Sequence, residues 1–199
     1  MEKKQVIITI GREFGSGGHE IAQKLADHYG LPLYDTNLLQ EVLDSKGIHG
    51  DKLEKFDEKQ KRFGVYRNVR GMESSPEVLV AHMQFDYLRD KAKSGESFVV
   101  VGRCAETVLK EYEATISIFV LGDKEEKVRR ITRIYNLSPS EAEEMMKKKD
   151  EKRKRYHNSF CEGKWGDSRN YELSVNSSKL GVDRTLDILI EYIEARRQG

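Results

Sequence analysis

A short apolar strand, a cluster of glycines and the start of a helix follow one another near the N-terminus. Residues 5–10 form a β-branched run without helical periodicity, which is typical of a buried parallel strand. Residues 11–18 (GREFGSGG) come next, and helical periodicity begins directly after them. Glycines allow backbone N–H groups to converge, and a helix N-terminus adds about half a positive charge. We therefore interpret residues 11–18 as an anion-binding turn; the alternative is a tight turn that needs glycine for its geometry alone.

Strand-like apolar runs alternate with helical segments along the rest of the chain. Four further strands are predicted at residues 33–35, 97–101, 115–121 and 171–176. Gly30 and Pro32 end the first helix, and residues 138–141 (SPSE) form a capping box that opens a later one. The alternation predicts one α/β domain over residues 1–199, a three-layer α/β/α architecture with a five-stranded parallel sheet.

Residues 46–75 interrupt this alternation. They are polar, punctuated by glycine and basic in their second half. A segment of this length without a periodic pattern is uncommon inside a compact domain. We therefore predict an inserted lobe there, after which Pro76 opens a helix that runs to about Lys93.

The balance of charge limits the partners that the chain can bind. Its 199 residues include 35 Lys and Arg against 34 Asp and Glu, a formal net charge of +1. A chain this close to neutral is not expected to coat a nucleic acid polymer or an anionic membrane. The charge is nevertheless segregated, because residues 147–155 carry seven cations and two acids. A local basic helix favours a small triphosphate as the partner.

Signals for membranes, disulfides and metals are sparse. No apolar run approaches the ~20 residues of a membrane span, and the run near the N-terminus is too short for a signal-peptide core. Cys104 and Cys161 are the only cysteines, and we interpret them as reduced thiols because they are too few for a disulfide scaffold. The five histidines show no metal-ligand spacing, and no Cys/His arrangement is recognisable. We expect a cytoplasmic protein.

Two phosphate-binding motifs fail when they are applied strictly to the glycine turn. A Walker A loop has four residues between its outer glycines and then lysine, whereas Gly11 and Gly17 are separated by five and Gly18 stands at the lysine position. The dinucleotide fingerprint also fails, since its last glycine is replaced by Glu20. Asp35 nevertheless follows the turn at the distance of a ribose-binding acid, which keeps a dinucleotide-dependent oxidoreductase open.

Four blocks, in order, resemble the cytidylate kinase-like group of P-loop proteins. They are residues 11–18, 34–36 (YDT), 101–104 (VGRC) and 171–177. The resemblance covers nearly the whole chain. It implies a fold of the P-loop NTPase type, kinase activity with ATP and Mg²⁺, an acceptor-binding lobe at residues 46–75 and a helical lid at residues 137–165.

The resemblance also implies roles for single residues. The loop that holds the ATP phosphates corresponds to Gly15, Ser16, Gly17, Gly18, His19 and Glu20, and the acceptor contacts to Asp35, Thr36 and Arg103. Thr36 has an alternative role as a helix N-cap, and Arg103 as a salt-bridge partner. The sequence departs from the family at Gly18, where lysine is expected, at Cys104, where aspartate is expected, and at Glu41, where arginine is expected.

Phosphoryl transfer depends on positioned phosphates, Mg²⁺ and nearby cations. We expect Arg12 to replace the missing lysine, unless it forms an ion pair with Glu13. Further catalytic groups are predicted at Arg133, Asp150 and Arg153, although a charged helix of this kind is also what a solvated surface requires. Glu20, in the first turn of its helix, is the predicted Mg²⁺ ligand or otherwise an acid favoured by the helix dipole.

The leading hypothesis is an ATP- and Mg²⁺-dependent phosphotransferase that acts on a nucleoside monophosphate, CMP before others, or on a similar small acceptor. A nucleotide-binding protein without catalysis is the second hypothesis, because the loop lysine is absent. The dinucleotide-dependent oxidoreductase is the third. In each case the expected partners are small molecules rather than nucleic acids or membranes, and the sequence predicts no oligomeric state.

Overall fold

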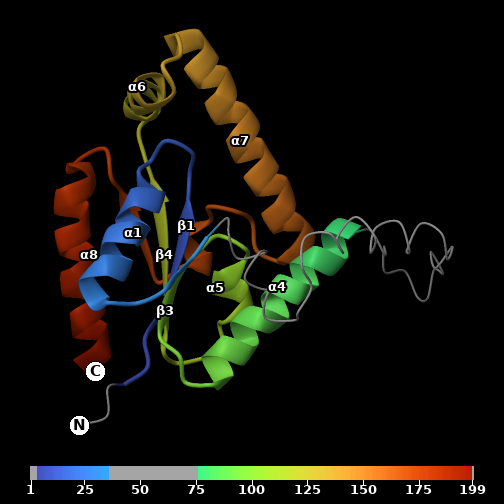
Figure 1. Cartoon of the computed structure of the whole chain (residues 1–199). Helices are drawn as coiled ribbons and strands as arrows, with labels where there is room; N and C mark the ends of the chain where they lie inside the picture. Colours follow the sequence, from blue (N-terminus) through green and yellow to red (C-terminus); the bar gives the residue numbers. More distant parts are fainter. Residues whose placement is uncertain (1–3, 36–75, 199) are drawn as a thin grey trace, which may run out of the picture.

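A five-stranded parallel sheet forms the centre of the molecule (Figure 1). The computed structural model describes residues 4–35 and 76–198. The strands lie in the order β2-β3-β1-β4-β5, and every neighbouring pair is parallel. Their bounds are β1 Ile7–Arg12, β2 Leu33–Tyr34, β3 Phe98–Val101, β4 Thr115–Leu121 and β5 Leu173–Asn176. This confirms the predicted parallel α/β sheet.

Helices cover both faces of the sheet, as predicted. α1 (Gly18–Tyr29) and α8 (Gly181–Gln198) pack on one face, whereas α4 (Pro76–Lys93) and α5 (Ala105–Val108) cover the other (Figure 1). Successive strand residues point to opposite faces, so Ile7 belongs to the core under α4 and Ile8 to the core under α1. Both faces are therefore apolar, which explains the β-branched runs without alternation.

Two further helices lie beyond the carboxyl ends of the strands. α6 (Lys124–Tyr135) follows β4, and α7 (Pro139–Phe160) packs against it and then descends toward α4 (Figure 1). Ile131, Ala142 and Met146 form the apolar contact between α6 and α7. A short 3-10 helix at Ser168–Asn170 precedes β5. The arrangement places the basic part of α7 above the edge where the strands end.

Local signals in the sequence predicted several boundaries correctly. β4 spans the predicted residues, and Gly30 ends α1 with φ 63° in the left-handed region. Ser138 caps α7 through a complete capping box with Glu141. Pro76 and Lys93 bound α4 as expected. These signals act within a few residues of each boundary, which is why they can be recognised without the tertiary structure.

Other boundaries differ from the prediction. β1 begins two residues later than expected and extends through Arg12, because Gly11 and Arg12 still pair with Phe119 and Val120 of β4. Arg12 therefore ends a strand and does not lie in the turn. α5 is a single turn, and α7 continues into the loop predicted from residue 158.

The predicted lobe at residues 46–75 lies outside the described residues, and so do Thr36 and Glu41. The role of residues 137–165 as a lid remains a prediction, although α7 forms most of that segment. None of the helices described here has the length and apolar character that crossing a membrane would require.

Candidate functional site

The glycine turn between β1 and α1 has the backbone geometry of an anion site. Gly15 has φ 86° and Gly17 has φ 79°, both in the left-handed region that glycine adopts without strain. A Cβ on Gly15 would also lie 2.9 Å from Cδ1 of Ile131 in α6. Within the described residues, neither glycine amide donates a hydrogen bond. Two free amides and the N-terminus of α1 thus meet at one place.

Hydroxyl groups hold this turn in shape. The hydroxyl of Ser16 donates to the carbonyl of Glu13 at 2.9 Å and accepts from the amide of Gly18 at 3.3 Å. The hydroxyl of Ser177, which follows β5, donates to the carbonyl of Ser16 at 2.5 Å. Ser16 and Ser177 are both buried. The turn is therefore fixed before any ligand arrives.

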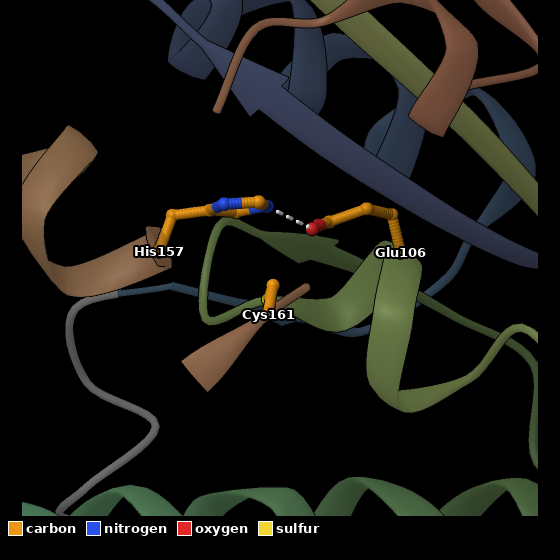
Figure 2. Close-up of side chains that lie close together, drawn as sticks. All are labelled: Glu106, His157 and Cys161. Atoms are coloured by element: carbon orange, nitrogen blue, oxygen red, sulfur yellow. Dashed lines mark hydrogen bonds and ion pairs between the residues drawn. The ribbon is translucent and has the colours of Figure 1, made fainter. Parts of the chain in front are cut away.

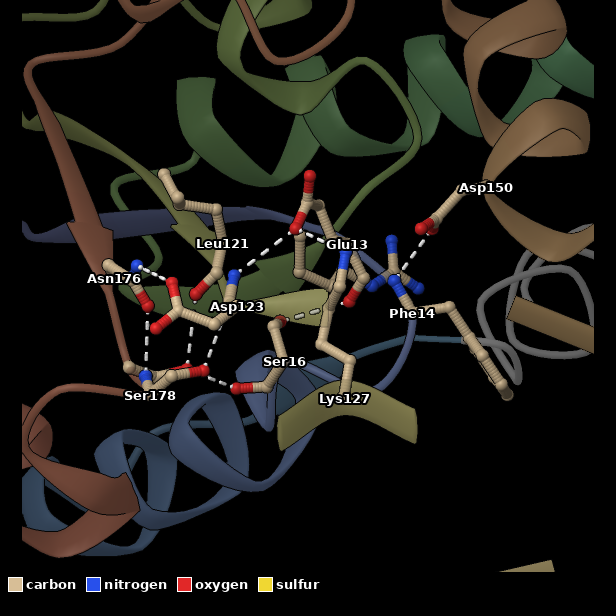
Figure 3. A network of polar contacts seen from close by, with 12 residues as sticks. Glu13, Phe14, Ser16, Leu121, Asp123, Lys127, Asp150, Asn176 and Ser178 are labelled. Carbon is tan, nitrogen blue, oxygen red and sulfur yellow. Dashed lines mark hydrogen bonds and ion pairs between the residues drawn. The ribbon is translucent and has the colours of Figure 1, made fainter. Parts of the chain in front are cut away.

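A largely buried ion pair lies beneath the turn. Nζ of Lys127 in α6 is 2.7 Å from Oε2 of Glu13, and the same oxygen accepts from the amide of Gly122 at 3.1 Å (Figure 3). Only 9% of the Lys127 side chain is exposed. Glu13 thus binds Lys127 and not Arg12, so the predicted alternative of an Arg12–Glu13 ion pair is not found among the described contacts.

The guanidinium of Arg12 is buried without full charge compensation. Burial, together with the charges of Arg153 and Arg103, lowers the pKa of Arg12 to about 9, although Asp35 and Asp150 oppose the shift. Its Nε atom is buried without a hydrogen-bond partner in the described structure. The group stays protonated at neutral pH. Three arginines against two carboxylates leave an excess of positive charge that an anionic ligand would neutralise.

A cavity of about 300 Å³ opens beside this group, and we call it the α7 cavity. Its lining includes Arg12, Asp35, Arg103, Lys149, Lys152 and Arg153. Arg103 and Cys104 follow β3 with φ 61° and 56°, which is unusual for residues with side chains and is typical of functional sites. The cavity is lined by cations from the ends of β1 and β3 and from α7, so it suits a phosphate-bearing ligand.

α7 contacts the turn directly. Oδ1 of Asp150 accepts from the amide of Phe14 at 2.6 Å (Figure 3). Nη1 of Arg153 donates to the carbonyl of Arg12 at 3.3 Å, and its guanidinium lies 5.3 Å from the ring centre of Phe14. Burial raises the pKa of Asp150 above its ordinary value, although the Phe14 amide and Arg153 oppose the shift. The charged face of α7 is therefore not only solvated surface, because two of its members hold the turn.

A second cavity, of about 270 Å³, lies on the other side of the turn, and we call it the α6 cavity. Its lining includes Gly15, Ser16, Arg130, Arg133, Ser177 and Val182. Arg133 is exposed there, whereas Arg130 forms an ion pair with Glu20. Glu20 also lies 3.5 Å from Nζ of Lys24. The predicted Mg²⁺ ligand is thus held between two cations.

The remaining predicted residues lie close to these cavities. Nε2 of His19 is 3.7 Å from Oδ2 of Asp35, which connects the start of α1 with the end of β2. The fold therefore brings Arg12, Asp35, Arg103 and Arg153 to the α7 cavity and Gly15, Ser16 and Arg133 to the α6 cavity. A larger hollow of about 610 Å³ lies at the amino ends of the strands. We do not place the site there, because ligands of open parallel sheets bind at the carboxyl ends.

Sequence reasoning missed two features of this site. Lys127 carried no signal, because its partner Glu13 is 114 residues away. Glu106, His157 and Cys161 form a buried cluster beside the α7 cavity, although no such Cys/His arrangement was expected (Figure 2). Burial opposes the charged imidazole, but hydrogen bonds to Cys161 and Glu106 outweigh it and raise the pKa of His157 to about 10. Only the four-residue spacing of His157 and Cys161 was visible in the sequence.

Comparisons with known proteins agree with this geometry. A model of the cytidylate kinase-like family matches residues 7–179. The chain is 23% identical over 198 residues to a protein named cytidylate kinase from Methanopyrus kandleri, covering 95% of this chain and 93% of that protein.

Solved structures show the same fold. An uncharacterised protein from Eubacterium ventriosum is 41% identical, with a TM-score of 0.76 and coverage of 96% of this chain and 99% of the other. The shikimate kinase from Bacteroides thetaiotaomicron is 13% identical, with a TM-score of 0.53 and coverage of 95% and 98%. The architecture is therefore that of the P-loop kinases.

Proposed function

The chain belongs to the cytidylate kinase-like family, and on that premise we propose that it is an ATP- and Mg²⁺-dependent phosphotransferase with a nucleoside monophosphate as the acceptor. The family and the fold support a nucleotide kinase. The acceptor is the specific part of the proposal. CMP is the first candidate, since related proteins carry the name cytidylate kinase.

The observation that carries the proposal is that one cavity adjoins the glycine turn and the other adjoins the end of β1, directly before that turn. The α6 cavity borders Gly15 and Ser16, whereas the α7 cavity borders Gly11 and Arg12. A kinase needs two ligands whose phosphates meet at one point, with cations on both sides of the transferred group. In our proposal ATP occupies the α6 cavity with its phosphates on the turn, and the acceptor occupies the α7 cavity.

The residues have separate tasks in this proposal. The amides of Gly15 and Gly17 bind the ATP phosphates, and Arg133 contacts the nucleotide from α6. Arg103 binds the phosphate of the acceptor, and Asp35 orients it. Arg12 stabilises the charge on the transferred phosphoryl group as a buried guanidinium, which takes the place of the lysine.

In this proposal α7 covers the site. Arg153 lies between the turn and the α7 cavity, and Asp150 keeps the helix in place through the Phe14 amide. With both substrates bound, α7 excludes water that would otherwise accept the phosphoryl group.

The donor set near the turn fits Mg²⁺. The cation prefers carboxylate and phosphate oxygens and keeps several waters, so one or two protein carboxylates suffice. Glu20 lies in the first turn of α1, and Asp35 lies within reach of His19 at the same end of that helix. We assign Glu20 as the ligand, directly once its carboxylate leaves Arg130 and Lys24, or otherwise through water. The cation neutralises charge on the ATP phosphates when it is bound.

A transfer assay with γ-labelled ATP and Mg²⁺ tests the proposal. The acceptors are nucleoside monophosphates, nucleosides and small phosphorylated metabolites, and we expect the label to move to CMP faster than to the others. Arg12→Ala and Arg103→Ala abolish transfer, whereas Arg89→Ala, on the exposed surface of α4, retains it. Equal turnover in all three variants contradicts the assigned roles.

The same assay separates the alternatives. Saturable ATP binding with no label on any acceptor supports a nucleotide-binding protein without catalysis. The observation that favours this alternative is Gly18, which stands where the loop lysine is expected. Binding of NAD in place of ATP supports the dinucleotide-dependent oxidoreductase.

A further inference from the structure

Three potential metal ligands converge where the C-terminal end of α7 meets the segment after β3, and a second cysteine, Cys104, packs beside them. The ligand atoms of Glu106, His157 and Cys161 all lie within 4.8 Å of one another (Figure 2). Nε2 of His157 is 2.7 Å from Oε1 of Glu106, and these side chains are only 6% and 4% exposed. A carboxylate, an imidazole and a thiol thus lie together in the interior.

Cys104 adds a second sulfur to this group. Its thiol lies close enough to that of Cys161 for the two groups to interact, and both cysteines are buried in the same apolar cluster as Phe85. Cys104 directly follows Arg103, and both residues have a left-handed backbone, with φ 56° at Cys104. The left-handed backbone directs the chain so that Cys104 and Glu106 face the same helix end.

We propose that Cys104, Glu106, His157 and Cys161 form a Zn²⁺ site. Two sulfurs, one imidazole nitrogen and one carboxylate oxygen match the ligands and the four-fold coordination that Zn²⁺ prefers. Cys161 follows the last residue of α7, and its amide donates to the carbonyl of His157 at 2.9 Å, which keeps the two residues together at the end of the helix. This inference does not depend on the kinase activity proposed above.

The surroundings of His157 support one mode of coordination. Its Nδ1 lies 3.4 Å from Oδ1 of Asn158, which also accepts from the amide of Trp165 at 2.9 Å. An Nδ1–H bonded to Asn158 leaves Nε2, on the Glu106 side, to bind the metal. Such an outer partner is what fixes the tautomer of a zinc-binding histidine.

The charge of the site can also be balanced. Two thiolates and a carboxylate exceed the charge of Zn²⁺ by one negative unit. Arg103 lies close enough to Cys104 and Tyr156 for its charge to act on both side chains. A guanidinium next to the cluster therefore offsets the remaining negative charge, which a buried ionic site requires.

The proposed ion would connect two separate segments of the chain at one wall of the α7 cavity. Cys104, Glu106 and His157 all line that cavity, which supplies a path for the ion. A bound ion would tie the end of α7 to the residues after β3, next to Arg103. Its role is structural, because all four ligands come from the protein and no coordination position is left for a substrate.

Metal binding is measured on the whole chain, reduced and stripped with a chelator. Co²⁺ serves as a spectroscopic probe, because four-coordinate Co²⁺ bound by thiolate absorbs in the visible and near-ultraviolet. We expect one Co²⁺ per chain with thiolate-to-metal absorption, displaced by one Zn²⁺. Elemental analysis of the protein purified without chelator should find about one zinc per chain.

Variants assign the ligands. Cys161→Ser and His157→Gln should weaken Zn²⁺ binding by more than the ~10–100-fold that loss of an outer partner causes. His28→Gln, which changes an exposed histidine of α1, is the matched control and should bind like the parent chain. Circular dichroism checks that each variant is folded.

Either of two results overturns the proposal. One is a reduced parent chain that binds neither Co²⁺ with thiolate absorption nor stoichiometric Zn²⁺. The other is full binding by folded Cys161→Ser. Because the readouts are stoichiometry and absorption, they are independent of phosphoryl transfer, so the two proposals can fail separately.

Discussion

Gly18 has no room for a side chain because Arg12 occupies the adjacent space. A Cβ on Gly18 would lie 2.6 Å from Cβ of Arg12 and 3.2 Å from Cβ of Val120. The backbone of Gly18 has no positive φ, so this restriction is steric and not conformational. The glycine at the lysine position and the arginine at the end of β1 are therefore sterically coupled. In our proposal the cation of the site comes from the strand and not from the helix.

Gly18→Lys tests this coupling. The new Cβ would displace Arg12 from the end of β1, so we expect a loss of about 1–3 kcal/mol in the free energy of unfolding, as for other overpacked sites. Urea denaturation measures the loss. His19→Lys, at the exposed neighbouring position, should change stability by no more than about 0.5 kcal/mol. Equal stability of the two variants would show that the space is not restricted.

Arg12→Met should separate activity from stability. The guanidinium is buried with incomplete compensation, so removing its charge while keeping apolar bulk should change the free energy of unfolding by less than about 1 kcal/mol. If Arg12 stabilises the transferred phosphoryl group, phosphoryl transfer should fall by roughly 10³-fold or more, as for other arginines with this role. Steady-state kinetics and urea denaturation give the two numbers. If Arg12→Met loses stability but keeps its turnover number, Arg12 has a structural role and not a catalytic one.

The Glu13–Lys127 pair should contribute strongly to the stability of the turn. Lys127→Met leaves the Glu13 carboxylate without its cation in a largely buried position, which should cost about 3 kcal/mol. The double variant Glu13→Gln/Lys127→Met should recover part of this loss, since neither charge then remains. Lys124→Met breaks an exposed pair with Glu143 and should cost less than about 1 kcal/mol. If Lys127→Met and Lys124→Met lose similar amounts of unfolding free energy, the burial of the Glu13–Lys127 pair does not increase its contribution to stability.

Asp150 should make stability depend on pH in acid. Burial raises its pKa in the folded chain above the ordinary 3.8, so the unfolded chain releases the proton first. The contribution of Asp150 to stability is therefore complete below pH 3.8 and falls as pH rises through the folded pKa. Asp150→Asn lacks this dependence, so its stability relative to the parent should improve as pH rises above 3.8 and then level off. A constant difference between the two unfolding curves would contradict the shift.

The elements of the fold were predictable where the information is local. β4 follows from seven consecutive apolar or β-compatible residues, and the start of α7 follows from Ser138 and Glu141, three positions apart. The glycines of the turn were also recognised correctly as a strand-to-helix connection, since positive φ at Gly15 and Gly17 is a property of the backbone there. Alternation of such elements then restricts the sheet to a parallel one.

The sequence by itself thus determined the order of strands and helices, the glycine turn and the family resemblance, because those depend on periodicity and on neighbouring residues. Only the tertiary structure decided that Arg12 belongs to β1, that Glu13 pairs with Lys127, and that Glu106 meets His157 from 51 positions away. The physical reason is distance along the chain. These contacts form only after crossover helices bring the carboxyl ends of separate strands to one edge, and no local pattern specifies which side chains meet there.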